Sequence, residues 1–293
     1  MSVYKRSYHP YSGPLAGSGA RFGAMMRYAL TDLWSSRITI VLSVLCLGPA
    51  LISLATIYIM NNETVRALIS NGMASNPVAI DERFFLVVLE VQCWPAVALT
   101  AWIGPWLVST DMTNTALPII LSHPVSRVEY VLAKFSLLAG YLSAVTWIPA
   151  LLLFMFQSYM SAVPWAAKNM HIALGMFAGG LIWVTLLALI ALATAAWVKW
   201  RIVATAMVVA ALFVPAGVGE VFNAVMHTEW GGVINIPMMM SALWRRFLKV
   251  DFSAFLARHE LPTSAILLAL TLICAGCVAA LNARIRAREV VRG

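Results

Sequence analysis

The fold is decided by two long apolar blocks and the three residues between them, residues 172–222: IALGMFAGGLIWVTLLALIALATAAWVKWRIVATAMVVAALFVPAGVGEVF. Each block is long enough to cross the hydrocarbon core of a bilayer, which takes about 20 apolar residues. The gap holds Lys199, Trp200 and Arg201, and cations are costly within a membrane. We therefore predict two spanning helices joined by a tight hairpin at a membrane surface, rather than one long helix.

Four further apolar blocks bring the number of predicted spans to six: 38–60, 84–108, 135–156, 172–198, 202–222 and 264–281. Of the 293 residues, 61% are hydrophobic and only 11% are charged, whereas soluble domains carry about 25% charged residues. The predicted fold class is an all-α integral membrane protein. Residues 1–21, rich in Gly, Ser and Pro, are expected to form a flexible cytoplasmic tail, and residues 22–293 the six-span transmembrane domain.

The distribution of basic residues predicts the orientation. With the N-terminus inside, the inner segments hold thirteen lysines and arginines and the outer segments seven. Because such residues favour the cytoplasmic side, both termini are expected in the cytoplasm. The net charge of +8 is then explained by topology and anionic lipid headgroups, and nucleic acid is not expected as a partner.

Two shorter segments outside the spans have helical periodicity. Apolar side chains in 22–34 recur on one face, with Arg27, Thr31 and Asp32 opposite, which indicates a helix lying in the inner membrane interface; a soluble helix packed on a partner is the alternative. In the outer segment before the last span, an apolar stripe begins at Ile236 and ends at Phe247. It predicts a short helix that caps the outer mouth or re-enters the membrane, with Trp244 at the interface.

Motifs for chemistry on this chain are absent. The sequence contains no GxxxxGK[ST], HExxH or GxSxG, and the five histidines have no ligand spacing. Cys274 and Cys277 form a CxxC within an apolar block, where packing explains them better than metal or redox chemistry. We therefore expect no catalytic residue, no metal site and no cofactor on this chain.

The inner connection between the second and third spans is the most informative segment. Residues 111–134 read DMTNTALPIILSHPVSRVEYVLAK. Pro118 and Pro124 break helices, so the segment is expected to be a short helix bracketed by turns. Its apolar side chains, among them Leu117 and Ile120, lie just outside the membrane and need a cover. Either a groove on a partner protein or the lipid headgroups would provide one.

This connection resembles that of the type-2 ABC transporter permease family, in which an acidic residue precedes "LLS-x-P-[VI]-S-R" and a closing "GK". Asp111, the run LSHPVSR at 121–127 and Lys134 match, whereas Asn114 and Ala133 stand where glycine is common. The resemblance implies an ATP-driven exporter in the bacterial inner membrane. It implies a permease homodimer or heterodimer and a pair of ATP-binding cassette subunits, which would carry the ATP and Mg. Its coupling residues would be Asp111, Leu117, Ile120, Pro124, Arg127 and Glu129.

Features within the spans are less specific. Glu90 and Glu220 are carboxylates in apolar blocks and are either part of a substrate path or gate, or structural. Gly175 and Gly179 form a small-residue face that permits close helix approach. Pro149 is one of five prolines that each free a carbonyl and permit a kink. A non-transport membrane enzyme, or an assembly subunit of a larger membrane complex, is the alternative function.

Overall fold

The computed structural model describes residues 17–65, 79–113, 127–161, 164–198, 200–250 and 261–284. These residues form helices and turns, and no strand occurs among them. The helices are α1 (Ser18–Ser35), α2 (Arg37–Asn61), α4 (Glu82–Thr113), α6 (Arg127–Val145), α7 (Trp147–Met160), α8 (Trp165–Lys168), α9 (Met170–Trp197), α10 (Arg201–Met226), the 3-10 helix η1 (Trp230–Ile234), α11 (Ile236–Phe247) and α13 (Thr263–Arg284).

Within these ranges, six helical segments are long and apolar enough to cross a membrane, which confirms the predicted all-α, multi-pass membrane class. They coincide with the predicted spans to within a few residues at most ends: Arg37–Asn61, Glu82–Val108, Val128–Met160, Met170–Trp197, Arg201–Met226 and Thr263–Arg284. The third segment differs most, since it extends seven residues before the predicted start at 135.

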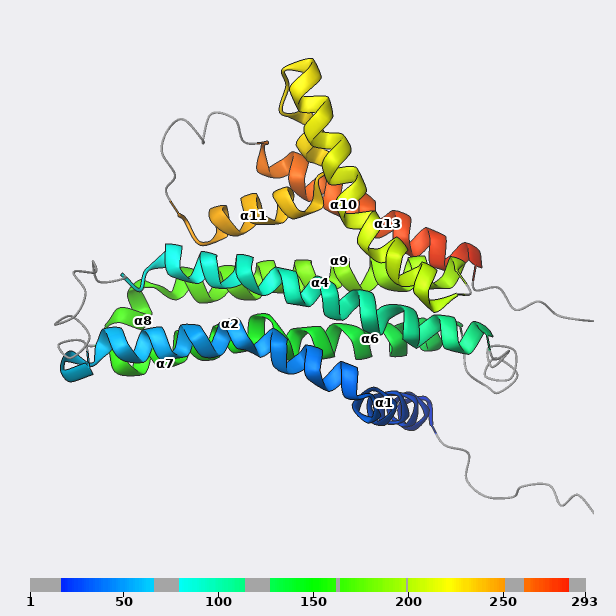
Figure 1. Ribbon diagram of the computed structural model, residues 1–293, viewed down its shortest axis with the longest axis horizontal. Coiled ribbons are helices and arrows are strands. Elements are labelled where there is room, and N and C mark those ends of the chain that lie inside the picture. The colour runs from blue at the N-terminus through cyan, green and yellow to red at the C-terminus, as the bar shows by residue number, and fades with distance from the viewer. Residues whose placement is uncertain are drawn as a thin grey trace, which may run out of the picture.

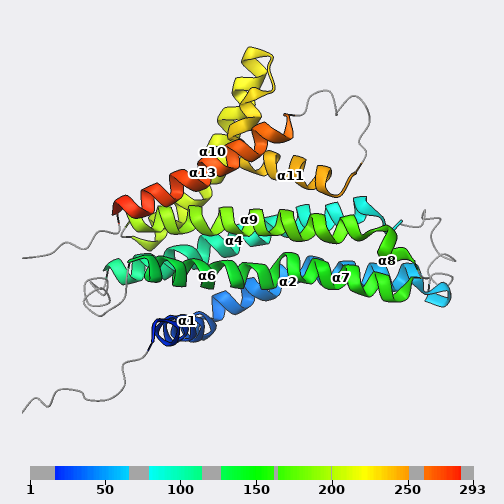
Figure 2. The same ribbon diagram turned by 180° about the vertical axis from the view of Figure 1, so that it is seen from behind.

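The helix α9 is the centre of the bundle. It packs against α4, α6, α7, α10, α11 and α13. It is apolar on every side, and one face of its first half, with Leu174, Phe177 and Leu181, is exposed. Figures 1 and 2 show α2, α4, α6, α7 and α9 running side by side, while α10 and α13 lean away with α11 between them and the bundle. We call the two ends of the bundle the α1 end and the α8 end, after the helices that lie there.

The third predicted span is two helices rather than one. The helix breaks at Thr146, between α6 and α7, three residues before Pro149. Because proline lacks an amide hydrogen, it cannot donate to the carbonyl four residues earlier, which is that of Val145. The side-chain amide of Gln92 on α4 donates to this carbonyl and, at 2.6 Å, to the carbonyl of Cys46 on α2. A buried glutamine therefore joins three spans at the break.

The amphipathic segment at 22–34 is helical, within α1. Arg27, Thr31 and Asp32 are exposed as predicted, and Leu33 on the apolar face is fully buried against the bundle. Trp34 is predicted to lie on the same apolar face but is 61% exposed, because its side chain lies at the edge of the face that contacts the bundle. The helix packs against α6 and the start of α2, and it lies across the spans at their end (Figure 1).

Candidate functional site

The chain reverses direction after α10 and returns beside it. His227 ends α10 in the left-handed conformation (φ 49°), and η1 then runs back along the last turns of α10. Gly219 and Gly231 meet backbone to backbone, since a Cβ built on either would lie 2.3 Å from the carbonyl oxygen of the other. The Gly231 amide donates to Asn223 Oδ1 at 2.7 Å. Two glycines therefore permit the return of the chain into the bundle.

The helix α11 lies antiparallel along half of α9. Gly175, near the start of α9, faces the backbone of Phe247, and Gly179 faces the indole of Trp244. Deeper in the bundle the Trp183 and Trp244 rings meet edge to face, 6.1 Å apart. The predicted small-residue face of α9 is thus the surface against which α11 packs. Since Trp183 lies near the middle of α9, α11 runs from mid-bundle to the α8 end without crossing (Figure 1).

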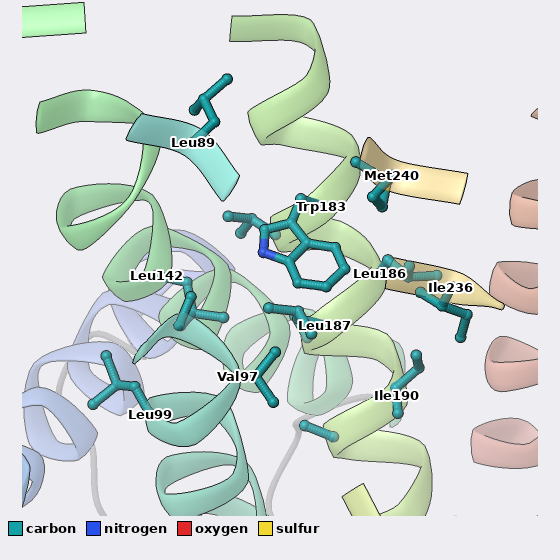
Figure 3. Close-up of a cluster of buried hydrophobic side chains, with 14 of the residues drawn as sticks. Leu89, Val97, Leu99, Leu142, Trp183, Leu186, Leu187, Ile190, Ile236 and Met240 are labelled. Atoms are coloured by element: carbon teal, nitrogen blue, oxygen red, sulfur yellow. The ribbon is translucent and has the colours of Figure 1, made fainter. Parts of the chain in front are cut away.

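The depth of α11 corrects one expectation. Trp244 was predicted to lie at a membrane interface, but it is only 3% exposed because it fills the space between α11 and α9. The predicted stripe is buried from Ile236 to Leu243, and Phe247 is half-buried. In Figure 3, Met240 and Ile236 of α11 lie beside Trp183 and Leu186 of α9. The helix α11 is thus packed beside half of α9 rather than exposed at the end of the bundle.

Three polar contacts hold α11. At its N-terminus, Asn235 accepts a hydrogen bond from the Met238 amide at 3.1 Å and donates one to Glu220 Oε1 of α10 at 3.0 Å. In its middle, the Ser241 hydroxyl donates to Glu90 Oε1 of α4. At its C-terminus, Arg246 donates to the carbonyl of Leu261 and, at 2.7 Å, to the Thr263 hydroxyl at the start of α13.

The structure therefore brings both predicted glutamates to one element. Glu90 and Glu220 come from different helices and both bond to α11, Glu90 half-buried and Glu220 exposed. Their partners Asn235 and Ser241 were missed by sequence reasoning. Asn235 carried a usable signal, because an asparagine followed at two residues by a proline is typical of a helix start. Ser241 carried none.

A cavity of about 280 Å³ lies beside the contact of Glu90 with Ser241. The helices α4, α9, α10 and α11 enclose it, with Trp183 at its base. Its wall is mostly apolar, and four of its residues are aromatic. The polar groups of the lining residues are the Glu90 carboxylate, the Ser241 hydroxyl, the Cys93 thiol and the indole nitrogens. The lining residues are Glu90, Cys93, Trp94, Val97, Trp183, Leu212, Phe213, Pro237, Met240, Ser241 and Trp244.

The residues of the predicted coupling connection lie apart from this site. Asp111 belongs to the last turn of α4, and Arg127 is the first residue of α6. Glu129 is half-buried in the first turn of α6. Leu117, Ile120 and Pro124 lie outside the described residues. The described ends of the connection are at the α1 end of the bundle, whereas α11 lies toward the α8 end (Figures 1 and 2).

The predicted hairpin between the fourth and fifth spans contains a cation packed on aromatic rings. The guanidinium carbon of Arg201 lies 4.2 Å from the centre of the Trp102 ring and 5.1 Å from that of Trp106. Such cation–π contacts stabilise a charge that leaves water. The start of α10 is thereby fixed against α4 at the α1 end.

Within the described part of the chain, no group of three or more His, Cys, Asp or Glu side chains is placed to hold a metal ion. The site can instead bind a ligand by apolar contact and through one carboxylate. Comparison with models of protein families gives no match, and comparison with curated proteins gives none.

Proposed function

We propose that this chain is the membrane-spanning permease subunit of an ABC exporter in the bacterial inner membrane, with both termini in the cytoplasm. The observation that carries the proposal is the sequence of 111–134, with LSHPVSR at 121–127 between an aspartate and a lysine. It joins α4 to α6, the second and third spans. The excess of basic residues in the inner segments supports the orientation.

The order of elements supports the same proposal. An amphipathic helix precedes the first of six candidate spans, and the short helix α11 precedes the last. In the proposed complex a pair of ATP-binding cassette subunits carries the ATP and Mg. A second permease chain, identical or related, completes the translocation path.

The helix α4 provides a mechanical link between the proposed coupling segment and α11. It is one helix of 32 residues, which places Asp111 near one end and Glu90 about 12 Å from the other. It packs against α9, with Gly104 close to Ala191, and Glu90 accepts a hydrogen bond from Ser241 of α11. Closure of the ATPase pair would displace the connection, and α4 would transmit that displacement to α11. Glu90 and Glu220 would then be gate residues that release or hold α11.

A pair of charged substitutions in the connection tests the proposal. Leu117→Asp with Ile120→Asp would place carboxylates in the docking groove of the ATPase, and burying an unpaired carboxylate costs several kcal/mol. The matched control is Leu117→Val with Ile120→Leu, which keeps the segment apolar. Each chain is purified from native membranes in mild detergent, and co-purifying ATPase and ATP hydrolysis are measured.

We expect the wild-type and control chains to retain an ABC ATPase, and the charged variant to lose it while remaining monodisperse. Retention of the ATPase at full stoichiometry by the charged variant would remove the connection as the coupling element. Absence of any ABC ATPase from the wild-type preparation would overturn the proposed function.

A further inference from the structure

The cavity between α4, α9, α10 and α11 has a buried base and an exposed rim. Trp183 and Trp244 at the base are each 3% exposed, and Leu212 is fully buried. At the rim, Trp94 of α4 is 62% exposed and Phe213 of α10 is 37% exposed. The cavity therefore opens sideways between two spans. An apolar molecule dissolved in the bilayer reaches it without passing through water.

Four of the eleven residues that line the cavity are aromatic. Trp94 and Phe213 stack across the rim, with ring centres 5.9 Å apart and planes 11° apart. Trp183 and Trp244 meet edge to face at the base. The faces of aromatic rings carry negative electrostatic potential and attract cations within about 6 Å, and tryptophan does so most strongly. The wall therefore favours a positively charged group that carries apolar substituents.

Glu90 is the one carboxylate among the residues that line the cavity. In the described part of the chain, its hydrogen-bond partner is Ser241, whose hydroxyl donates to Glu90 Oε1. A hydroxyl satisfies one lone pair but supplies no positive charge, and carboxylates within a membrane are usually paired with a cation. Glu90 and the rings thus act on a ligand in the same sense, since both attract positive charge.

Other ligand classes fit the cavity less well. An anion would meet the Glu90 carboxylate, and a neutral apolar molecule would leave that carboxylate without a counter-charge. Calcium requires six or more oxygen ligands and magnesium requires octahedral geometry, whereas among the residues that line the cavity the side-chain oxygens are those of Glu90 and Ser241. The volume of about 280 Å³ lies at the small end of ligand pockets and suits one ring with a compact charged group.

We propose that this cavity is a binding site for an apolar organic cation, such as an arylalkyl ammonium or a quaternary ammonium compound. The ammonium group lies between Glu90 and the ring faces of Trp94 and Phe213, and the apolar part fills the base. As a binding site the proposal stands on the cavity alone. As the substrate class of the exporter, it rests on the proposed function.

The test uses the purified full-length chain in lipid nanodiscs and two probes of the same shape. Benzyltrimethylammonium carries the charge, and neopentylbenzene is its neutral isostere, with carbon in place of nitrogen. Binding is measured by saturation-transfer NMR and isothermal titration calorimetry. We expect the cation to bind at least about tenfold more tightly than the isostere, because a carboxylate attracts only the charged probe.

Three variants separate the contributions of charge, ring and overall electrostatics. Glu90→Gln keeps the hydrogen-bond acceptor but removes the charge, so the preference for the cation should fall to the smaller factor that the aromatic rings alone provide. Trp94→Leu removes an exposed ring and should weaken cation binding several-fold. Glu63→Gln removes a carboxylate from an exposed position at the end of α2 and should leave binding unchanged.

Equal affinity for the two probes, or an unchanged preference in both Glu90→Gln and Trp94→Leu, would overturn the proposal. A loss of preference in Glu63→Gln as large as in Glu90→Gln would also overturn it, since the attraction would then be unspecific. Cation binding by a chain that recruits no ABC ATPase would keep the site and remove the proposed function. Recruitment of the ATPase without cation binding would keep the proposed function and overturn the proposed binding site.

Discussion

Substitution of Gly179 by alanine tests the close packing of α11 against α9. A Cβ at this position would lie 2.3 Å from both Cδ1 and Nε1 of the Trp244 indole, whereas ordinary contact begins at 3.4 Å. The indole is a rigid ring packed edge to face against Trp183, and it cannot swing aside as the end of a flexible side chain can. The helix α11 must therefore move away from α9 by about 1 Å or more.

The magnitude follows from two opposing terms. Overpacking of a buried contact costs about 1–3 kcal/mol, and replacing glycine by alanine within a helix returns up to about 1 kcal/mol. Gly140 on α6 provides the matched control, since a Cβ built on it meets no atom within 4 Å. Gly140→Ala should therefore gain only the stabilisation that comes from the higher helix propensity of alanine. The free energy of unfolding of Gly179→Ala should therefore lie about 1–3 kcal/mol below that of Gly140→Ala.

The two variants are compared by titrating SDS into mild detergent and following unfolding by circular dichroism. Cation binding is measured alongside, because Trp244 also lines the cavity and its displacement should weaken binding in Gly179→Ala alone. Equal unfolding free energies for the two variants would refute the close packing of α11 on α9. The cavity enclosed by these helices would then lose its structural basis.

Three further outcomes are expected. Gln92→Leu leaves the Val145 carbonyl without its donor and should lower the unfolding free energy by about 1–3 kcal/mol in the same SDS titration; a value equal to the wild type would show that the carbonyl finds another donor. Asn235→Ala removes the N-cap of α11 at a cost of about 1 kcal/mol and should speed amide hydrogen exchange in α11 but not in α9. Unchanged exchange rates in α11 would show that Asn235 does not stabilise the start of this helix. In a chain without native cysteines, a cysteine at Ser126 should react with an impermeant maleimide only from the inside and one at Thr228 only from the outside, and the opposite pattern would invert the proposed topology.

The six spans could be predicted from sequence because a single physical requirement determines them. A helix that crosses a bilayer needs about 20 apolar residues with all backbone hydrogen bonds made internally. The length of an apolar block in the sequence is therefore enough to predict a span. The break at Thr146 could not be predicted in the same way. Proline within a span permits a kink without requiring one, and the outcome here depends on Gln92, which lies more than fifty residues from Val145 in the sequence.

The site at α11 shows where periodicity ceases to be informative. A stripe from Ile236 to Phe247 predicts that one face is buried but not which helix buries it, and Trp244 was placed at an interface for that reason. The decisive contacts are between residues far apart in sequence, such as Glu90 with Ser241.

A helix that begins inside a bundle nevertheless needs features that a sequence can be searched for. Its first amides lie in an apolar surrounding and need acceptors, so an N-cap such as Asn235 is required there rather than optional. The cap in turn needs a partner for its own amide hydrogens. Glu220 is that partner, because the chain reversal at His227 returns Asn235 to the side of α10. In this chain the tight reversal at His227, the cap Asn235 and the carboxylate of Glu220 near the end of α10 therefore act together to hold the start of α11 within the bundle.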